Sequence, residues 1–253
     1  MILDSSSIYL LASLFFIVAL AYSTVGLGGG SSYTAIMTLA GMSTLLIPTL
    51  SLTLNLIVTS IASYEFIRKK HTRFKLILPF VITSIPMAYL GGYLQLPKEV
   101  FYWLLLVSLI AVALRIYIWK EIRLILELNP AQQLVLALFS GAILGLISGI
   151  VGLGGGIYLV PLILLLGLGT EKQAAASGAV FIWLNSCSGL AARVQHNSVD
   201  LSGFIPLIIA VALGGYIGSH LGAGKLKPQQ MDQILGLLIL ISIAFLIRKL
   251  LFL

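Results

Sequence analysis

The chain has 253 residues, of which 59% are hydrophobic and 9% are charged. A soluble domain carries about 25% charged residues, and the mean hydropathy of +1.10 gives this chain more apolar surface than one core can bury. These values exclude a soluble protein and predict an all-α polytopic membrane protein. The net charge of +7 is then explained by basic cytoplasmic loops rather than by nucleic-acid binding.

Ten apolar segments follow one another along the chain. They cover approximately residues 8–25, 31–42, 45–67, 76–95, 99–118, 131–150, 157–168, 173–192, 203–221 and 231–252. Most are long enough for a hydrocarbon core that takes about 20 helical residues. The second and the seventh are too short for an easy crossing and are predicted to be half-helices or re-entrant pieces. We therefore expect 8–10 crossings.

The hexapeptide VGLGGG occurs twice, at Val25–Gly30 and at Val151–Gly156, a separation of 126 residues. Further residues match at the same shift: Gly41 with Gly167, Thr44 with Thr170, Ser51 with Ser177, and Ser60 with Ser186. This pattern predicts two tandem transmembrane repeats of about five segments each, residues 1–125 and 126–253, joined in one integrated membrane domain. Such duplication is typical of membrane transporters.

Basic residues mark one side of the membrane. Five of them lie in the loop 68–75, which we expect to be cytoplasmic. If all ten segments cross, the two halves are inverted; if the two short segments are re-entrant, the halves are parallel. Each arrangement places 11 of the 15 basic residues inside, so charge leaves both open. Paired broken helices favour inverted repeats.

The glycine runs are the first candidates for a substrate site. A break inside the membrane frees backbone N–H and C=O groups and starts a new helix, whose first N–H groups carry a partial positive charge. Such a helix end binds anions, and glycine allows a ligand to approach the backbone closely. We predict that Gly28, Gly29, Gly30, Gly154, Gly155 and Gly156 contribute to substrate binding. The alternative, close helix packing, is the interpretation of two other glycine series, Gly141/Gly145/Gly149 and Gly214/Gly218/Gly222.

Polar residues in the apolar segments are the second group of candidates. The predicted substrate-binding residues are Ser31, Ser32, Asn55, Thr59, Ser177, Asn185, Ser186 and Arg193. An asparagine inside a spanning helix serves either a cavity or an interhelical hydrogen bond. Arg193 and Glu65 lie toward helix ends, where their charges can instead reach the membrane surface. His220 is the histidine best placed for a proton relay.

No catalytic residue, metal site or cofactor is predicted. The His, Cys and carboxylate residues have no metal-ligand spacing, and neither glycine run has the lysine of a phosphate-binding loop. A rhomboid-like protease would need Ser148 with His220 as its base, but the serine stands in G-x-x-S-G rather than G-x-S-G. A transporter of a metal cation or an amine is the other alternative, and it would require buried acidic residues.

The sequence resembles the TauE/SafE family of sulfite-exporter-like permeases. The resemblance lies in the two VGLGGG copies, the second followed by IYLVPLILLLGLGTEKQAAASGAVFIWLNSCSG, and in the RKKHTRFK loop before a segment with Pro79 and Pro86. The first copy departs from the pattern, with Thr34-Ala35 in place of Val160-Pro161. The resemblance implies export or uptake of sulfite or of sulfonates such as sulfoacetate, isethionate or taurine, across a prokaryotic inner membrane.

The expected function is secondary transport of a small sulfur-containing anion by alternating access around the two glycine breaks. The expected partners are this anion, the lipid bilayer and, as a homodimer, a second copy of the chain; nucleic acid is not expected. The direction of transport and the coupling ion stay open.

Overall fold

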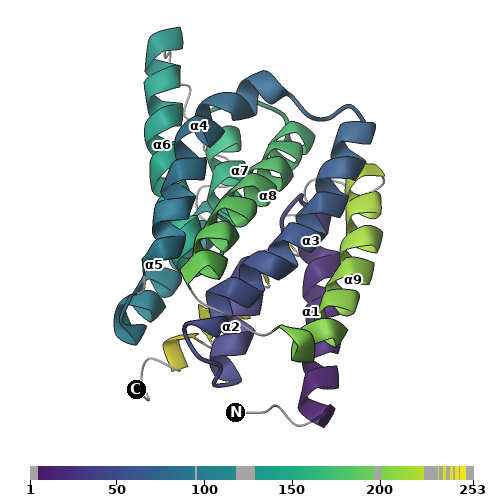
Figure 1. Cartoon of the computed structure of the whole chain (residues 1–253). Helices are drawn as coiled ribbons and strands as arrows, with labels where there is room; N and C mark the ends of the chain where they lie inside the picture. Colours follow the sequence, from purple (N-terminus) through teal and green to yellow (C-terminus); the bar gives the residue numbers. More distant parts are fainter. Residues whose placement is uncertain are drawn as a thin grey trace.

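The computed structural model describes residues 5–94, 96–117, 129–196 and 201–224, together with isolated positions between 233 and 248. These residues form helices and no strand, which confirms the all-α class (Figure 1). The helices are α1 (Ser5–Thr24), α2 (Gly30–Leu39), α3 (Leu46–Arg68), α4 (Phe74–Tyr93), α5 (Lys98–Tyr117), α6 (Pro130–Val151), α7 (Gly156–Leu165), α8 (Glu171–His196), the 3-10 turn η1 (Ser202–Phe204) and α9 (Ile205–Gly224).

Five of the described helical segments are long and apolar enough to cross a membrane, as expected for a polytopic membrane protein. They are Leu46–Arg68, Phe74–Tyr93, Pro130–Val151, Glu171–His196 and Ser202–Gly224. Helices α2 and α7 have ten residues each. Because a helix rises about 1.5 Å per residue, each covers about half of a hydrocarbon core of about 30 Å. The number of crossings stays a prediction.

The glycine runs end one helix and begin the next. Helix α1 is followed by Gly26 at φ 72°, and α6 is followed by Gly152 at φ 80°. Helices α2 and α7 are then preceded by Gly29 at φ 91° and Gly155 at φ 76°. These left-handed conformations are strained for residues with a Cβ. The two breaks therefore share a left-handed glycine at two equivalent positions 126 residues apart, and they differ between these positions, because Gly154 is left-handed (φ 75°) and Gly28 is not.

The glycine series on α6 packs against a neighbouring helix, as predicted, and that helix is α4. A Cβ at Gly141, Gly145 or Gly149 would collide with a backbone carbonyl of α4; these carbonyls belong to Phe80, Ser84 and Ala88. Both series increase in residue number together, so α4 and α6 run in the same direction. Their contact is the most extensive between any two described helices.

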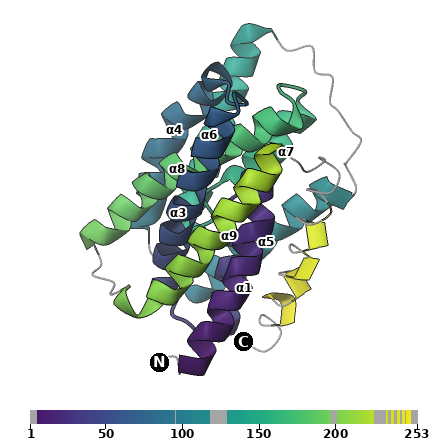
Figure 2. The same cartoon turned by 90° about the vertical axis from the view of Figure 1, so that its right-hand side faces the viewer.

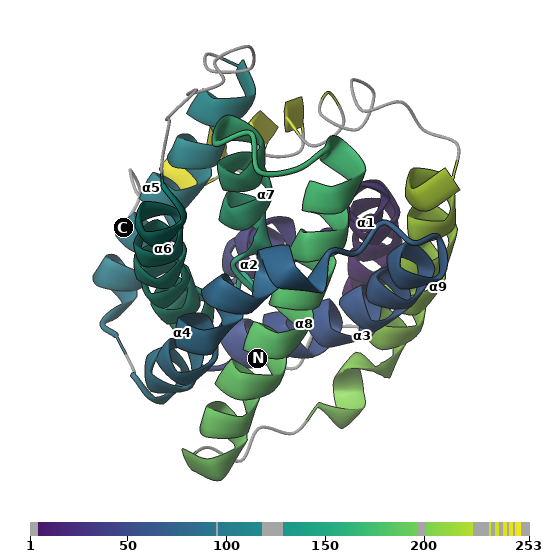
Figure 3. The same cartoon turned by 90° about the horizontal axis from the view of Figure 1, so that it is seen from above.

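The second glycine series joins α9 to α1 in the same way. Gly214, Gly218 and Gly222 lie against backbone carbonyls of α1, which belong to Phe16, Leu20 and Thr24. The order of the contacts again shows that the two helices run in the same direction. Figure 2 shows α1 and α9 side by side, and Figure 3 shows this pair at one edge of the bundle and α4 with α6 at the other.

Helices at equivalent places in the two predicted halves run in opposite directions. Helix α3 runs parallel to α9, because Val58 contacts Gly215 and Glu65 contacts His220. Helix α8 runs parallel to α4, because Ser188 bonds to α4 near its middle and Gly92, near the end of α4, lies against Ala192. Thus α1, α3 and α9 point one way and α4, α6 and α8 the other, as Figure 1 shows. Since α1 and α3 point the same way, α2 leads the chain back between them.

Two parts of the predicted organisation fall on residues outside this description. The boundary between residues 125 and 126 lies in the segment 118–128, and the last apolar segment, 231–252, is described only at isolated positions. The two repeats as complete units therefore stay a prediction.

Candidate functional site

The two glycine breaks meet inside the bundle. A Cβ at Gly30, in the first break, would lie 3.0 Å from the carbonyl oxygen of Gly152 in the second. Ser51 on α3 bridges them, because its hydroxyl lies 2.7 Å from the Gly152 oxygen and 3.4 Å from the Gly30 oxygen. The prediction from sequence matched Ser51 to Ser177 but did not include it among the site residues.

Asn55 on α3 contacts both breaks and has no solvent exposure. Its side-chain Nδ2 donates to the Gly152 carbonyl oxygen over 3.2 Å. Its amide also lies where a Cβ at Gly28 or Gly30 would be, and 3.3 Å from a Cβ at Gly154. Among the described residues, no donor bonds to its Oδ1. Asn55 therefore holds the breaks together and leaves one acceptor unused between them.

Helix α8 touches both breaks from the other side. The backbone of Ala175 lies where a Cβ at Gly26 would be, and Ile182 packs against Gly154. The carbonyl oxygen of Gly178 would lie 2.9 Å from a Cβ at Gly156. The glycines in contact with α3 and α8 thus leave no room for a side chain, so close packing contributes to their presence.

The serines after the first break bond to a tyrosine that the sequence prediction missed. The hydroxyl of Tyr22, near the end of α1, lies 2.9 Å from the Oγ atoms of both Ser31 and Ser32. A tyrosine in an apolar helix needs a partner for its hydroxyl, and this requirement is the signal in the sequence. The three hydroxyls fasten the start of α2 to the end of α1.

Three other predicted residues bond to their own helices. Thr59 donates to the Asn55 carbonyl, Ser177 to the Gln173 carbonyl, and Asn185 to the Phe181 carbonyl. All are four residues apart, the usual geometry of a buried polar side chain that satisfies itself on a helix. The neighbouring Ser186 hydroxyl is buried and has no hydrogen-bond partner among the described residues.

Several buried polar atoms around the breaks are without a partner in the described part of the chain. The Tyr33 hydroxyl would lie 2.9 Å from a Cβ at Gly29, and the Ser148 Cβ 3.4 Å from one at Gly155. With Asn55 Oδ1, they form a set of unused hydrogen-bonding groups near both helix starts. Buried polar groups are rarely left unpaired, so these groups can bond to a water or a polar ligand.

Arg193, the last predicted site residue, lies apart from this centre, near the end of α8. It is 3% exposed, and its Nη2 donates to the carbonyl oxygens of Gly149 and Ile150 at 2.8 and 2.9 Å. These carbonyls belong to the last turn of α6, where a cation is favourable.

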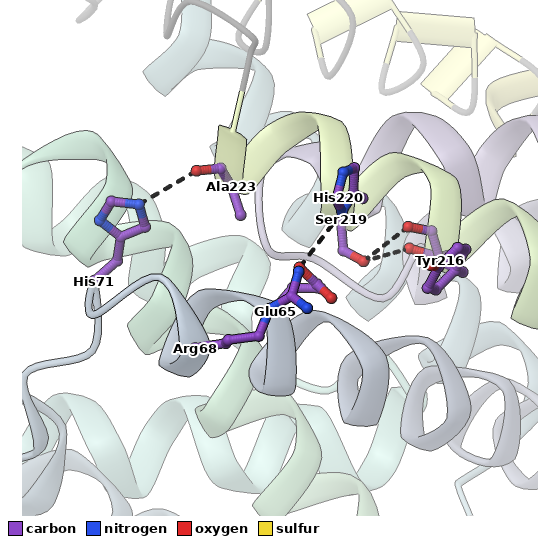
Figure 4. Close-up of polar contacts among 8 residues, drawn as sticks. Glu65, Arg68, His71, Tyr216, Ser219, His220 and Ala223 are labelled. Carbon is purple, nitrogen blue, oxygen red and sulfur yellow. Dashed lines mark hydrogen bonds and ion pairs between the residues drawn. The ribbon is translucent and has the colours of Figure 1, made fainter.

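Glu65 and His220 lie together at the C-terminal end of α3 (Figure 4). The Glu65 carboxylate is 2.8 Å from Nη2 of Arg68 and 3.6 Å from Nδ1 of His220. Nearby, His71 and Lys172 both lie 3.3 Å from the carbonyl oxygen of Ala223, at the end of α9. The basic loop, the start of α8 and the end of α9 thus meet at this end of the bundle.

The described residues hold only part of the chemistry that the alternative functions would require, because Glu65 is a buried acid (2% exposed) that is already paired with Arg68. They contain no group of three side chains that could hold a metal ion. His220 contacts Glu65 rather than Ser148, whose hydroxyl has no hydrogen-bond partner there. What the site brings together is neutral hydrogen-bonding side chains, among them the acceptor Oδ1 of Asn55, with helix starts and glycine backbone.

Comparison with known proteins adds the family to this geometry. The sequence profile described as "Sulfite exporter TauE/SafE" matches residues 11–246. The chain belongs to the TauE/SafE family. It is thus a multi-pass membrane protein of a transporter family, and this assignment favours transport over catalysis.

This TauE/SafE chain is similar to proteins of two bacteria. It is 36% identical over 236 residues to the probable membrane transporter protein y4hK of Sinorhizobium fredii (strain NBRC 101917 / NGR234). The aligned region covers 92% of this chain and 95% of that relative. It is 32% identical over 103 residues to the probable membrane transporter protein YunE of Bacillus subtilis (strain 168). That aligned region covers 40% of this chain and 36% of the relative. No solved structure is significantly similar to the chain.

Proposed function

We propose that this chain is a secondary transporter of small sulfur-containing anions, such as sulfite, sulfoacetate, isethionate or taurine. The observation that carries the proposal is the meeting of two glycine breaks, each starting a helix, at Ser51 and Asn55. The N–H groups at such helix starts lack partners within the helix and favour negative charge. A sulfonate or sulfite offers three oxygens as acceptors for such donors.

The proposed mechanism is alternating access between two inverted repeats. The opposite directions of α1 and α6, of α3 and α8, and of α4 and α9 support inversion, since each pair is equivalent in the predicted repeat. In such transporters, broken helices hold the substrate at the repeat interface while the two halves tilt against each other. The centre is closely packed around Asn55, so access requires α3 or α8 to move.

We further propose a prokaryotic inner-membrane location with the loop 68–75 in the cytoplasm. The five basic residues of this loop support the assignment. Lys172 at the start of α8 lies at the same end of the bundle, so the positive-inside rule applies to two separate segments.

Binding to purified protein tests the proposal directly. In a neutral detergent, sulfite or one of the three sulfonates should raise the melting temperature in a saturable way, whereas chloride at equal ionic strength should not. Asn55→Leu should reduce the shift, because it removes the amide that lies between the breaks. If none of the four anions shifts the melting temperature, the assignment to sulfur-containing anions is wrong.

A further inference from the structure

Arg193 is a buried cation, and no carboxylate among the described residues pairs with it. Its side chain lies in a spanning helix and is 3% exposed. Among the described residues, the ion pairs within 4.0 Å are those of Glu65 with Arg68 and with His220, at the far end of α3. Burying an unpaired charge is costly, and two carbonyl oxygens offset that cost only partly.

The guanidinium has donors left for a ligand. It carries five N–H groups, and the Gly149 and Ile150 carbonyls both accept from the same nitrogen, Nη2. Nε is buried and has no hydrogen-bond partner in the described part of the chain. An arginine that served only to cap the end of α6 would need no more than the bonds to these carbonyls. The spare donors suit an oxyanion, which binds two guanidinium nitrogens at once.

A cavity lies beside Arg193. Its volume is about 90 Å³, and its lining includes Thr44, Pro48, Ile150 and Arg193. A single water needs only about 10–15 Å³ of such space, so the cavity has room for an oxyanion of four or five heavy atoms. Thr44 and Arg193 are the lining residues whose side chains carry hydrogen-bond donors.

The cavity adjoins the centre where the breaks meet. Pro48 lines the cavity and also contacts the second break, since a Cβ at Gly152 would lie 2.7 Å from its Cα. Ser51 and Asn55 follow Pro48 at i+3 and i+7, on the same face of α3. This face therefore leads from the cavity to the polar groups between the breaks.

Arg193 also lies far from the basic loop 68–75. The basic loop 68–75 follows the end of α3, whereas the cavity is lined by Thr44 and Pro48 at the start of that helix. A basic residue that only marked the cytoplasmic side would be expected with the loop 68–75. Its position at the opposite end calls for another explanation.

We propose that Arg193 and this cavity form a second anion site, at the outer end of the route, which binds the sulfite or sulfonate group as it enters or leaves the centre. The ligand class rests on the proposed function. The site itself rests on a buried cation with no carboxylate partner among the described residues, on its spare donors and on the adjoining cavity. Thr44 contributes a hydroxyl, and Pro48 connects the site to the break.

Affinity measurements on the full chain in neutral detergent test the site, with sulfite and methanesulfonate as probes. Arg193→Gln should weaken binding about tenfold to a hundredfold, the range for loss of hydrogen bonds to a charged group. Arg193→Lys keeps the charge but loses the fork, and should be intermediate. Thr44→Val replaces the hydroxyl by a methyl group of nearly the same shape and should weaken binding severalfold. It tests the site independently if Arg193→Gln does not fold. Arg73→Gln, in the exposed basic loop, is the matched control and should bind like wild type.

The outcomes separate this inference from the proposed function. Wild-type affinity in both Arg193→Gln and Thr44→Val overturns the second site and leaves the central site standing. Absence of binding in wild type overturns both. Anionic phospholipid is tested in the same way as the soluble probes. If it binds in a manner that depends on Arg193 and the soluble probes do not, the site holds a lipid headgroup and the inference is wrong.

Discussion

Alanine at Gly29 and alanine at Gly41 should have different costs, although both positions are left-handed. Their φ angles are 91° and 74°, so either substitution strains the backbone by about 1–2 kcal/mol. An added Cβ meets nothing within 4 Å at Gly41, but at Gly29 it would lie 2.8 Å from Cζ of Tyr33 and 3.0 Å from Cγ1 of Val18. The Tyr33 ring is fully buried and packs on Phe15 with centroids 4.7 Å apart, so it has little room to move.

Overpacking of this kind costs about 1–3 kcal/mol. We therefore expect Gly29→Ala to lose about 2–5 kcal/mol of unfolding free energy and Gly41→Ala about 1–2 kcal/mol. The second break offers the same comparison: Gly155 and Gly167 lie at φ 76° and 63°, and only Gly155 is crowded, with Phe181 Cε1 at 2.8 Å from the added Cβ.

Thermal unfolding in mild detergent, followed by helical circular dichroism, measures both pairs. Gly29→Ala should melt several degrees below Gly41→Ala, and Gly155→Ala below Gly167→Ala. The valine variants at Gly29 and Gly155 should also abolish transport while still inserting into the membrane. Equal melting temperatures within both pairs would refute the close packing of the breaks against α1, α2 and α8.

Three further substitutions test the contacts that hold the site. Ser51→Ala removes the hydroxyl that bridges the breaks and should lower the free energy of unfolding by about 1–2 kcal/mol. The control is Ser13→Ala, at an exposed serine that bonds only to its own helix, and it should change stability little. Equal effects of the two substitutions would argue against the bridge. Gly218→Ala places a methyl group against an α1 carbonyl and should lower the free energy of unfolding by about 1–3 kcal/mol. The control is Gly203→Ala, whose methyl group meets open space. Similar melting curves for the two variants would contradict the packing of α9 on α1. Tyr22→Phe removes two hydrogen bonds and should cost about 1–2 kcal/mol, so an unchanged melting temperature would show that they do not hold α2.

The positions of the helices could be predicted from the sequence, because a helix that lies in a membrane appears as an apolar segment whose length can be read from the hydropathy. The segments expected at 31–42 and 157–168 are α2 and α7, both ten residues long and both preceded by a left-handed glycine. The two glycine series also pack as predicted, since a residue without a side chain at every fourth position leaves a groove for a neighbouring helix.

The centre of the site was only partly predictable, because it depends on which helices cross. Asn55 was expected in the site from its polarity alone, and the structure brings it to both breaks. Ser51 and Tyr22 are ordinary helical residues in the sequence, and their roles appear only when α3 and α1 lie beside the breaks. The pairing of Arg193 with a cavity likewise depends on the packing of α8 against the ends of α3 and α6.

Transport by the purified chain in liposomes tests the central claim most directly. Vesicles preloaded with unlabelled sulfite should take up radiolabelled sulfite faster than empty vesicles, with saturation and with competition by sulfoacetate, isethionate or taurine. Gly155→Val should insert equally well and lose this exchange. Uptake of none of these anions by wild-type protein, or unchanged exchange in Gly155→Val, would contradict an anion transporter that works through its two glycine breaks.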